Sequence, residues 1–367
     1  MDVEQEKTES PIKQATDPKA ALIVSEYTIS EYSASLRYLL GALEESSVPA
    51  ALVCSAGCDV ESIVNANVEV FRHPAIDLPL MGRQNRKMLL EKLRKFEPTI
   101  LHCLCESQAS LSRRLSRKLD LPYILSVNSL QKRFSNFSIS AKRCAKIIVP
   151  AESIAANIED VHPHFAEKLM RINFGTCVAE TAACFSKPTG PGSMVVAAPL
   201  EGASGLDNLL EAVHHLAVEN YDFMLVIITG SQTDKDLRKR IASLGLSQFT
   251  VIVSRQHPWD RILAAGDIFI QPWPCDDFNP MLLEAMSQGT AVAACTGRVD
   301  DLVIDEQTAV TFDPEDQLSI YNSLKGLFDR PELAKQIAAA AQQHLRKNNS
   351  IEETTSQIIE LYREPNV

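Results

Sequence analysis

Short runs of Ile, Val and Leu alternate along this chain with longer segments whose apolar positions recur at helical spacing. Continuous apolar runs are typical of strands buried on both faces of a sheet, and helical segments between them are typical of crossover connections. The pattern therefore predicts an α/β fold with parallel sheets covered by helices. The strands are expected at residues 20–25, 50–54, 68–72, 99–103, 123–127, 146–149 and 169–172, and then at 194–198, 223–228, 249–253, 268–271, 291–294 and 309–312.

The alternation occurs twice, and a breaker-rich segment at residues 184–193 separates the two halves. This segment contains Lys-Pro-Thr-Gly-Pro-Gly-Ser, through which neither a helix nor a strand continues. A chain of 367 residues is also too long for one ordinary core. We expect a disordered tail at residues 1–18, a first domain at 19–187 and a second domain at 188–349. Three helices are expected after the last strand, beginning near Asp316, Pro331 and Ser350.

The composition, 45% hydrophobic and 23% charged, is typical of a soluble globular protein, and no apolar run is long enough to cross a bilayer. The first 18 residues are polar and acidic, unlike a secretory signal. Nine cysteines occur without a Cys-x-x-Cys pair, which favours a reducing compartment, so we expect a cytoplasmic protein. His102, Cys103 and Cys105 are interpreted as a buried strand end, and neither a metal nor another cofactor is expected.

The net charge of −11 is unevenly distributed, because residues 80–147 contain 15 Lys and Arg but only 4 Asp and Glu. Within them, cations alternate with apolar residues in a helical pattern, the cations being Arg83, Arg86, Lys87, Lys92, Arg94 and Lys95. Two interpretations stay open: a solvated helix face, or a surface that lies on an anionic membrane and makes the protein peripheral to the inner membrane surface. Nucleic acid is not expected, because the rest of the chain is acidic and no aromatic-interleaved basic motif occurs.

Residues 276–289, Asp-Asp-Phe-Asn-Pro-Met-Leu-Leu-Glu-Ala-Met-Ser-Gln-Gly, predict a loop that leads into a short helix. Asn279 is suited to cap the helix, Pro280 to its first turn, and Gly289 to its end. Asp276 then lies on the loop, and Glu284 projects from the helix into the same crevice. One carboxylate can chelate the vicinal hydroxyls of a ribose while the other reaches a second sugar.

This segment resembles the signature of the family 4 (group 1) glycosyltransferases, in which two glutamates are separated by seven residues and the second begins Glu-Ala-Met. Here Asp276 replaces the first glutamate, and Glu284 matches the second. A weaker resemblance extends over roughly residues 20–362. It implies the GT-B architecture, two Rossmann-like domains whose parallel sheets face across a cleft, with a last helix at 350–367 that returns to the first domain. It also implies metal-free, retaining transfer from a nucleotide-sugar to a glycan, lipid or small-molecule acceptor.

The resemblance also assigns roles to single residues. Asp276 would be catalytic and hold the donor sugar, Glu284 would hold the ribose, and Asn128 would lie on the acceptor side, where many members carry a His. The other residues that would bind the donor are Phe278, Asn279, Gly297, Arg298, Ser204, Gly205, Gly230 and Arg255. Arg298 is not required by the family pattern, and we expect it to compensate for missing contacts to the diphosphate.

Several positions depart from the family pattern. Pro199 and Ser204 stand where the family has the Arg and Lys that hold the diphosphate, and residues 25–30 lack the usual Gly-Gly. Each lost charge-assisted hydrogen bond to phosphate is worth about 1.5–3 kcal/mol. A second hypothesis is therefore a non-catalytic GT-B scaffold or binding protein. Motifs of serine hydrolases, P-loop NTPases and dinucleotide-binding dehydrogenases do not occur.

Overall fold

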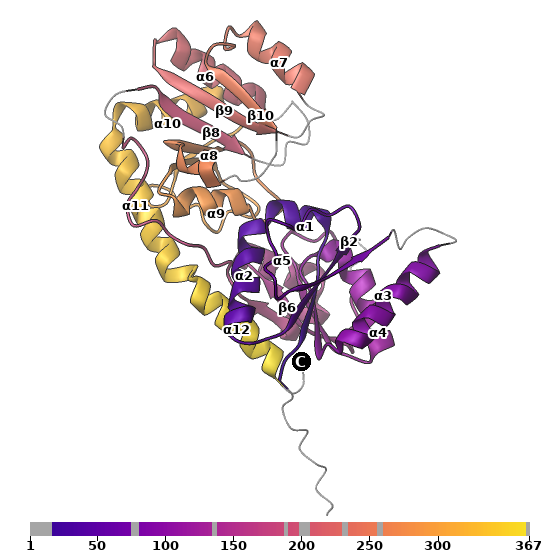
Figure 1. The fold of residues 1–367 in the computed structure, drawn as a ribbon. Helices are drawn as coiled ribbons and strands as arrows, with labels where there is room; N and C mark the ends of the chain where they lie inside the picture. Colours follow the sequence, from indigo (N-terminus) through magenta and orange to yellow (C-terminus); the bar gives the residue numbers. More distant parts are fainter. Residues whose placement is uncertain are drawn as a thin grey trace, which may run out of the picture.

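The computed structural model describes residues 17–74, 81–133, 138–186, 190–197, 206–229, 234–254 and 260–364. Residues 1–16 of the expected tail and the expected domain boundary at 188 lie outside these ranges. The described chain forms two lobes, each built around one parallel sheet with helices on its faces (Figure 1). The predicted α/β class with two parallel sheets is confirmed.

The first sheet has seven strands in the order β3-β2-β1-β4-β5-β6-β7. The strands are β1 (Ala20–Ile23), β2 (Ala50–Ser55), β3 (Glu69–His73), β4 (Ile100–Cys103), β5 (Tyr123–Ser126), β6 (Cys144–Val149) and β7 (Leu169–Arg171). The helices are α1 (Glu26–Glu31), α2 (Ser33–Glu45), α3 (Gly82–Phe96), α4 (Ala109–Leu119) and α5 (Glu152–Val161), with short 3₁₀ helices η1 (Glu106–Gln108) and η2 (Pro163–Lys168).

The second sheet has six strands in the order β10-β9-β8-β11-β12-β13. The strands are β8 (Gly192–Ala197), β9 (Phe223–Thr229), β10 (Thr250–Ser254), β11 (Ile268–Gln271), β12 (Ala291–Cys295) and β13 (Val310–Phe312). The helices are α6 (Asp207–Val218), α7 (Asp234–Ser243), α8 (Asp260–Ala264), α9 (Pro280–Ser287), α10 (Gln317–Asp329) and α11 (Pro331–Asn348). The parallel order puts the carboxyl ends of β11 and β12 side by side at one edge of the sheet.

Every strand that the hydrophobic pattern predicts is present, with ends that differ by at most two residues. The agreement has a simple cause: the central strands are buried along their whole length, as in β1, β4 and β11, so each is a continuous apolar run. The three helices expected after the last strand also begin at the expected positions.

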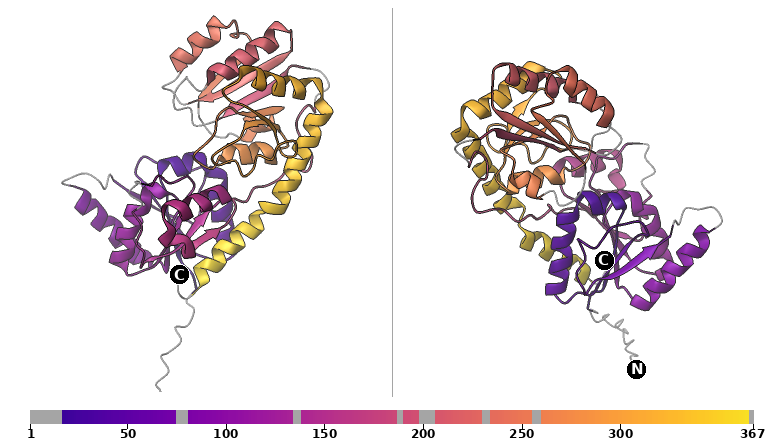
Figure 2. Two further views of the ribbon diagram at one scale, coloured as in Figure 1. Left: turned by 180° about the vertical axis from the view of Figure 1, so that it is seen from behind. Right: turned by 45° about the horizontal axis from the view of Figure 1, so that its top comes forward.

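The final helix, α12 (Ile351–Arg363), packs on the first domain, while α11 before it packs on the second. The two helices run along one side of the molecule and join the lobes (Figures 1 and 2). Tyr362 of α12 contacts His102 of β4, with 2.6 Å between its hydroxyl and Nδ1, and Ser126 Oγ lies 2.9 Å from Nε2. Burial lowers the pKa of His102 to about 3, so this histidine is a neutral core residue.

Among the described residues, no helix combines the length and the apolar character that a bilayer crossing requires.

Candidate functional site

The loop after β11 and the helix α9 carry the two acids that the sequence singles out. Asn279 caps α9, since its Oδ1 accepts hydrogen bonds from the backbone N–H of Met281 at 3.0 Å and of Leu282 at 3.2 Å. Pro280 occupies the first turn, and Gly289 follows the helix with φ of +75°. The predicted unit of loop, capped helix and glycine stop is confirmed.

Glu284 lies where α9 meets the crossing segment, residues 172–186, which leads from the first domain towards the second. Its Oε1 accepts a hydrogen bond of 3.2 Å from the hydroxyl of Thr176, which is buried in that segment. Tyr38 of α2 also lies near Glu284. The pKa of its hydroxyl is raised first by burial and then by the negative charge of Glu284. The carboxylate of Glu284 is thus partly buried at the junction of the two domains.

Asp276 and Arg298 form an ion pair between the loops that follow β11 and β12. Both side chains are accessible, with 46% of Asp276 and 56% of Arg298 exposed. Gly297 and Arg298 have positive φ values of +108° and +64°, and the N–H of Gly297 donates to Asp300 Oδ2 at 2.6 Å. This turn holds Arg298 over Asp276, so a cation sits beside the acid that the sequence assigns to the donor sugar.

Phe278 and Asn279 are engaged within the protein. The ring of Phe278 is 3% exposed and lies 5.1 Å from the ring of Phe174, which in turn lies 5.2 Å from the ring of Tyr32. Asn279 also donates through Nδ2 to Gln271 Oε1 at 2.9 Å. Both side chains therefore support the loop, and a direct contact of either with a donor stays a prediction.

Asn128 lies in the loop after β5, at the seam between the domains. Its carbonyl accepts a hydrogen bond of 2.8 Å from Phe278 N–H, and the N–H of Leu130 donates to the carbonyl of Asp276 at 2.8 Å. Ser129 and Asp277 form an antiparallel bridge between these two bonds. The structure thus brings the expected acceptor-side residue directly against the loop of the expected catalytic acid. We call residues 128–130 and 276–278 the seam ladder.

Three further residues at the seam are not among those that the sequence predicts. Tyr32 donates from its hydroxyl to the carbonyl of Phe278 at 3.0 Å, and Tyr27 donates to Asp277 Oδ2 at 3.1 Å. Glu106, the first residue of η1, accepts hydrogen bonds from the Asn128–Ser129 loop. An acid shortly after the end of a buried strand, as Glu106 is three positions after the last residue of β4, could have drawn attention to the third of them.

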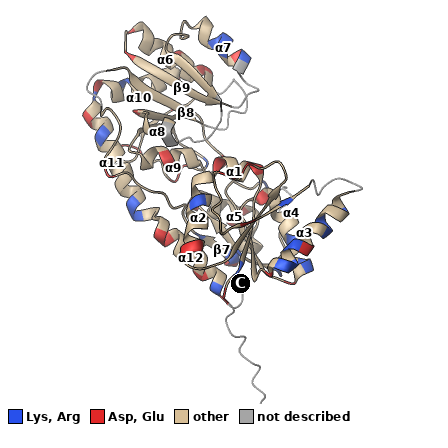
Figure 3. Cartoon of the chain, in the orientation of Figure 1, with Lys and Arg blue, Asp and Glu red and all other residues tan. Residues whose placement is uncertain are grey.

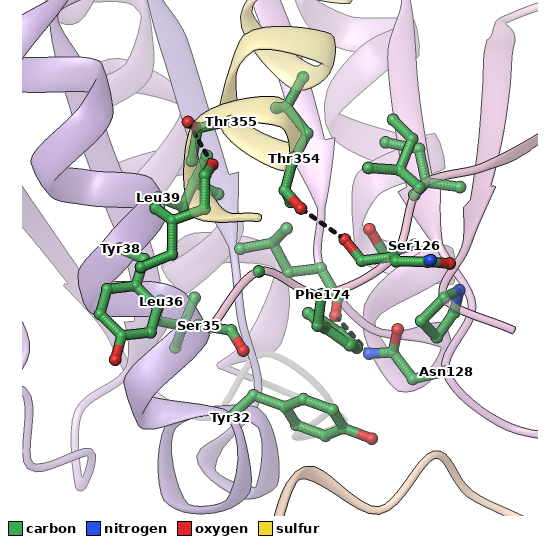
Figure 4. A pocket seen from close by; sticks show the side chains of 18 of the residues that line it. Tyr32, Ser35, Leu36, Tyr38, Leu39, Ser126, Asn128, Phe174, Thr354 and Thr355 are labelled. Carbon is green, nitrogen blue, oxygen red and sulfur yellow. Dashed lines mark hydrogen bonds between the residues drawn. The ribbon is translucent and has the colours of Figure 1, made fainter. Parts of the chain in front are cut away.

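An apolar cavity of about 60 Å³ lies in the first domain, between α2, α12 and the sheet (Figure 4). Tyr32, Asn128 and Phe174 are among the residues that line it, and all three also belong to the contacts around Phe278. The side chain of Asn128 donates to the carbonyl of Leu104 at 3.3 Å, while its Oδ1 is buried without a hydrogen-bond partner. A small group with a hydrogen-bond donor would therefore satisfy this oxygen.

The remaining candidate residues lie outside the described ranges. Ser204 and Gly205, like Pro199, follow β8 in the sequence, Gly230 follows β9, and Arg255 follows β10. Their expected roles stay predictions.

Residues 182–344 match the family model of glycosyl transferases group 1. Comparison with curated protein sequences finds no significant match. Among solved structures, a glycosyltransferase from Rickettsia africae has a TM-score of 0.76 at 14% identity, covering 95% of this chain and 98% of that chain. Sucrose-phosphate synthase from Thermosynechococcus elongatus gives 0.74 at 15% identity, covering 94% and 98%. HepE from Anabaena, in complex with UDP, gives 0.73 at 14% identity, covering 94% and 99%. These likenesses confirm the expected GT-B fold.

Proposed function

We propose that this chain, whose residues 182–344 match the model of glycosyl transferases group 1 and which has the GT-B fold, transfers a sugar from a nucleotide-sugar to an acceptor with retention of configuration. The second domain would bind the donor, and the first domain would bind a glycan, lipid or small-molecule acceptor on the side of Asn128. HepE has been solved with UDP and with UDP-glucose, which supports a uridine diphosphate sugar as the first donor to test.

The observation that carries this proposal is the position of Asp276. Its half-exposed carboxylate stands at the carboxyl end of β11, against the first domain and beside Arg298, while Glu284 follows on the helix of the same loop. In open α/β sheets, ligands collect at this edge. Asp276 would hold the donor sugar, and Glu284 would chelate the ribose hydroxyls.

Bond cleavage would leave positive charge at the anomeric carbon and negative charge on the departing diphosphate. Groups placed where charge develops lower the barrier, because they stabilise the transition state more than the bound donor. Arg298, in the loop after β12, is paired with Asp276. Its guanidinium group could leave this ion pair and bind the diphosphate instead.

Calorimetric titration tests the function directly. The protein is titrated with UDP, GDP, ADP and their common sugar conjugates, and the conjugates of any base that binds are then tested for sugar release. We expect micromolar binding of one base and a slow hydrolysis of its sugar conjugate. Failure of the whole panel to bind would overturn the transferase proposal and leave the scaffold as the better account.

One observation favours that alternative, a non-catalytic GT-B scaffold. Asp276 is neutralised by Arg298, and its loop is joined to the first domain by the seam ladder. A donor sugar must compete with both interactions. In a scaffold, the same contacts would fix the two domains, and the cleft would serve a binding partner.

We also propose that the first domain contacts an anionic membrane surface at the cytoplasmic side. Most apolar positions of α3 do not carry this proposal, because Leu89, Leu93 and Phe96 are buried in the first domain's core and only Met88, 47% exposed, is an accessible large apolar side chain of the helix. What supports it is charge: cations gather on α3 (Figure 3), and Arg94 and Lys95 lie in its last turn as Arg117 and Lys118 do in the last turn of α4. The binding would therefore be electrostatic.

Charge reversal on α3 tests the membrane proposal. Arg83→Glu combined with Arg94→Glu is expected to reduce pelleting with phosphatidylserine vesicles by more than tenfold, since each basic residue near such a surface contributes about 1 kcal/mol. The matched control is Lys235→Glu combined with Lys239→Glu on α7, two exposed positions of the second domain. Equal recovery of the unmodified protein with neutral and anionic vesicles would end the proposal.

A further inference from the structure

Glu106 is an acid of the first domain that gathers three hydrogen bonds on one oxygen. Its Oε1 accepts from Asn128 N–H at 2.6 Å, from Ser129 N–H at 2.8 Å, and from the Ser129 hydroxyl at 2.9 Å. Glu106 begins η1 three positions after the last residue of β4, whereas Asn128 and Ser129 follow β5, the neighbouring strand. The carboxylate therefore ties together two loops at the carboxyl edge of the first sheet.

The loop that Glu106 holds is the first-domain half of the seam ladder. Asn128 uses its N–H for Glu106 and its carbonyl for Phe278, and the next peptide N–H, that of Ser129, also goes to Glu106. Leu130 then donates to the carbonyl of Asp276. The hydrogen bonds alternate between Glu106 on one side of the loop and the second domain on the other, so the carboxylate fixes the loop in the conformation that the ladder requires.

Energetics make this dependence strong. Hydrogen bonds to a charged group contribute about 1.5–3 kcal/mol each, and a backbone N–H left without an acceptor is costly. Removing the carboxylate deprives two adjacent N–H groups of their acceptor at once. A rotation of the loop that turns these N–H groups toward water then lowers its free energy, and the same rotation moves the carbonyl of Asn128 away from Phe278.

We propose that Glu106 is a positioning residue: by holding residues 128–129 it sets the seam ladder, and through the ladder it sets where Asp276 stands against the first domain. The ladder itself is independent of any activity. Only its consequence for turnover rests on the proposed function, because Asp276 would have to meet a donor sugar at a defined place.

Hydrogen exchange of the backbone amides tests the ladder. The amide hydrogens of Leu130 and Phe278 are the donors that cross the seam, so Glu106→Ala is expected to speed their exchange roughly 10- to 100-fold. Glu106→Gln should give an intermediate effect, since its amide oxygen can still accept these bonds without the charge, and it also keeps the loop folded. Ser107→Ala, at the exposed neighbour in η1, is the matched control and should leave both amides unchanged.

Two results would overturn the proposal. One is unchanged exchange of Leu130 and Phe278 in Glu106→Ala. The other is an equal rise in exchange at β9, far from Glu106 in the second domain, because it would mean general destabilisation. If the donor titration identifies a substrate, kcat should fall in Glu106→Ala while the affinity for the nucleotide without its sugar stays constant, and Glu106→Gln should partly restore kcat. If no donor binds, the proposed function fails, yet the exchange result still decides the role of Glu106.

Discussion

Replacement of Glu284 by alanine is expected to weaken donor binding by about 100-fold or more. A carboxylate that accepts hydrogen bonds from both ribose hydroxyls contributes about 1.5–3 kcal/mol per bond, and about 3 kcal/mol corresponds to two orders of magnitude in affinity. Glu284→Gln should lose less, because its amide oxygen still accepts one hydroxyl. Calorimetric titration of each variant with the nucleotide that binds the unmodified protein measures the effect.

The control for Glu284 comes from its own surroundings. Thr176→Val removes the hydrogen bond that Glu284 accepts inside the protein and keeps the carboxylate, with almost no change of side-chain shape. If Glu284 chelates the ribose, this variant should bind the donor as the unmodified protein does. Equal losses in Thr176→Val and Glu284→Ala would instead assign Glu284 to the packing of the crossing segment, and unchanged affinity in Glu284→Ala would remove it from the donor site.

The parts of the fold that the sequence predicts correctly are those that depend on patterns of neighbouring residues. Buried parallel strands appear as apolar runs, and the cap of α9 appears as Asn279 followed by Pro280, because both features depend on residues close together in the chain. The positions of Asp276 and Glu284 follow from the same local unit. Their relation to the first domain does not, since it depends on the relative placement of two separate sheets.

The seam ladder illustrates what the sequence does not encode locally. Its hydrogen bonds join backbone atoms of residues 128–130 and 276–278, and every residue except proline has the same backbone donor and acceptor. Glu106 acts on this ladder through the N–H groups of Asn128 and Ser129, and only one of its three hydrogen bonds there, from the Ser129 hydroxyl, joins two side chains, so the pairing of side-chain types indicates little of its role. Patterns of residue types predict which elements form, but contacts between main chains of different domains require the assembled structure.

The amphipathic pattern of α3 shows a different limit. The same spacing of Leu89, Leu93 and Phe96 serves a helix on a membrane and a helix on a protein core. The structure buries these residues in the first domain's core, which leaves the cations and Met88, 47% exposed, as accessible features of the helix. The pattern thus predicts the helix correctly. It does not predict whether a protein core or a membrane packs against the apolar side of the helix.

Gly289→Ala is expected to destabilise the protein by about 2–5 kcal/mol. Gly289 has φ of +75°, which costs other residues about 1–2 kcal/mol, and overpacking a filled site costs about 1–3 kcal/mol. The added Cβ would lie 2.4 Å from the Cα of Ala182 and 3.0 Å from the backbone nitrogen of Ala183. These are main-chain atoms of the crossing segment, and the carbonyl of Gly289 accepts the Ala183 N–H at 3.1 Å, so neither side can give way without losing that bond.

Gly41→Ala supplies the matched control, because the same methyl group enters α2 where it meets no described atom within 4 Å. It should leave stability unchanged or raise it by up to about 1 kcal/mol, the helix preference of alanine over glycine. Urea unfolding followed by circular dichroism compares the midpoints of the two variants. Since Gly289 ends the helix that carries Glu284, a lowered midpoint should be accompanied by weaker donor binding. Equal midpoints for Gly289→Ala and Gly41→Ala would contradict the close packing of the crossing segment against the end of α9.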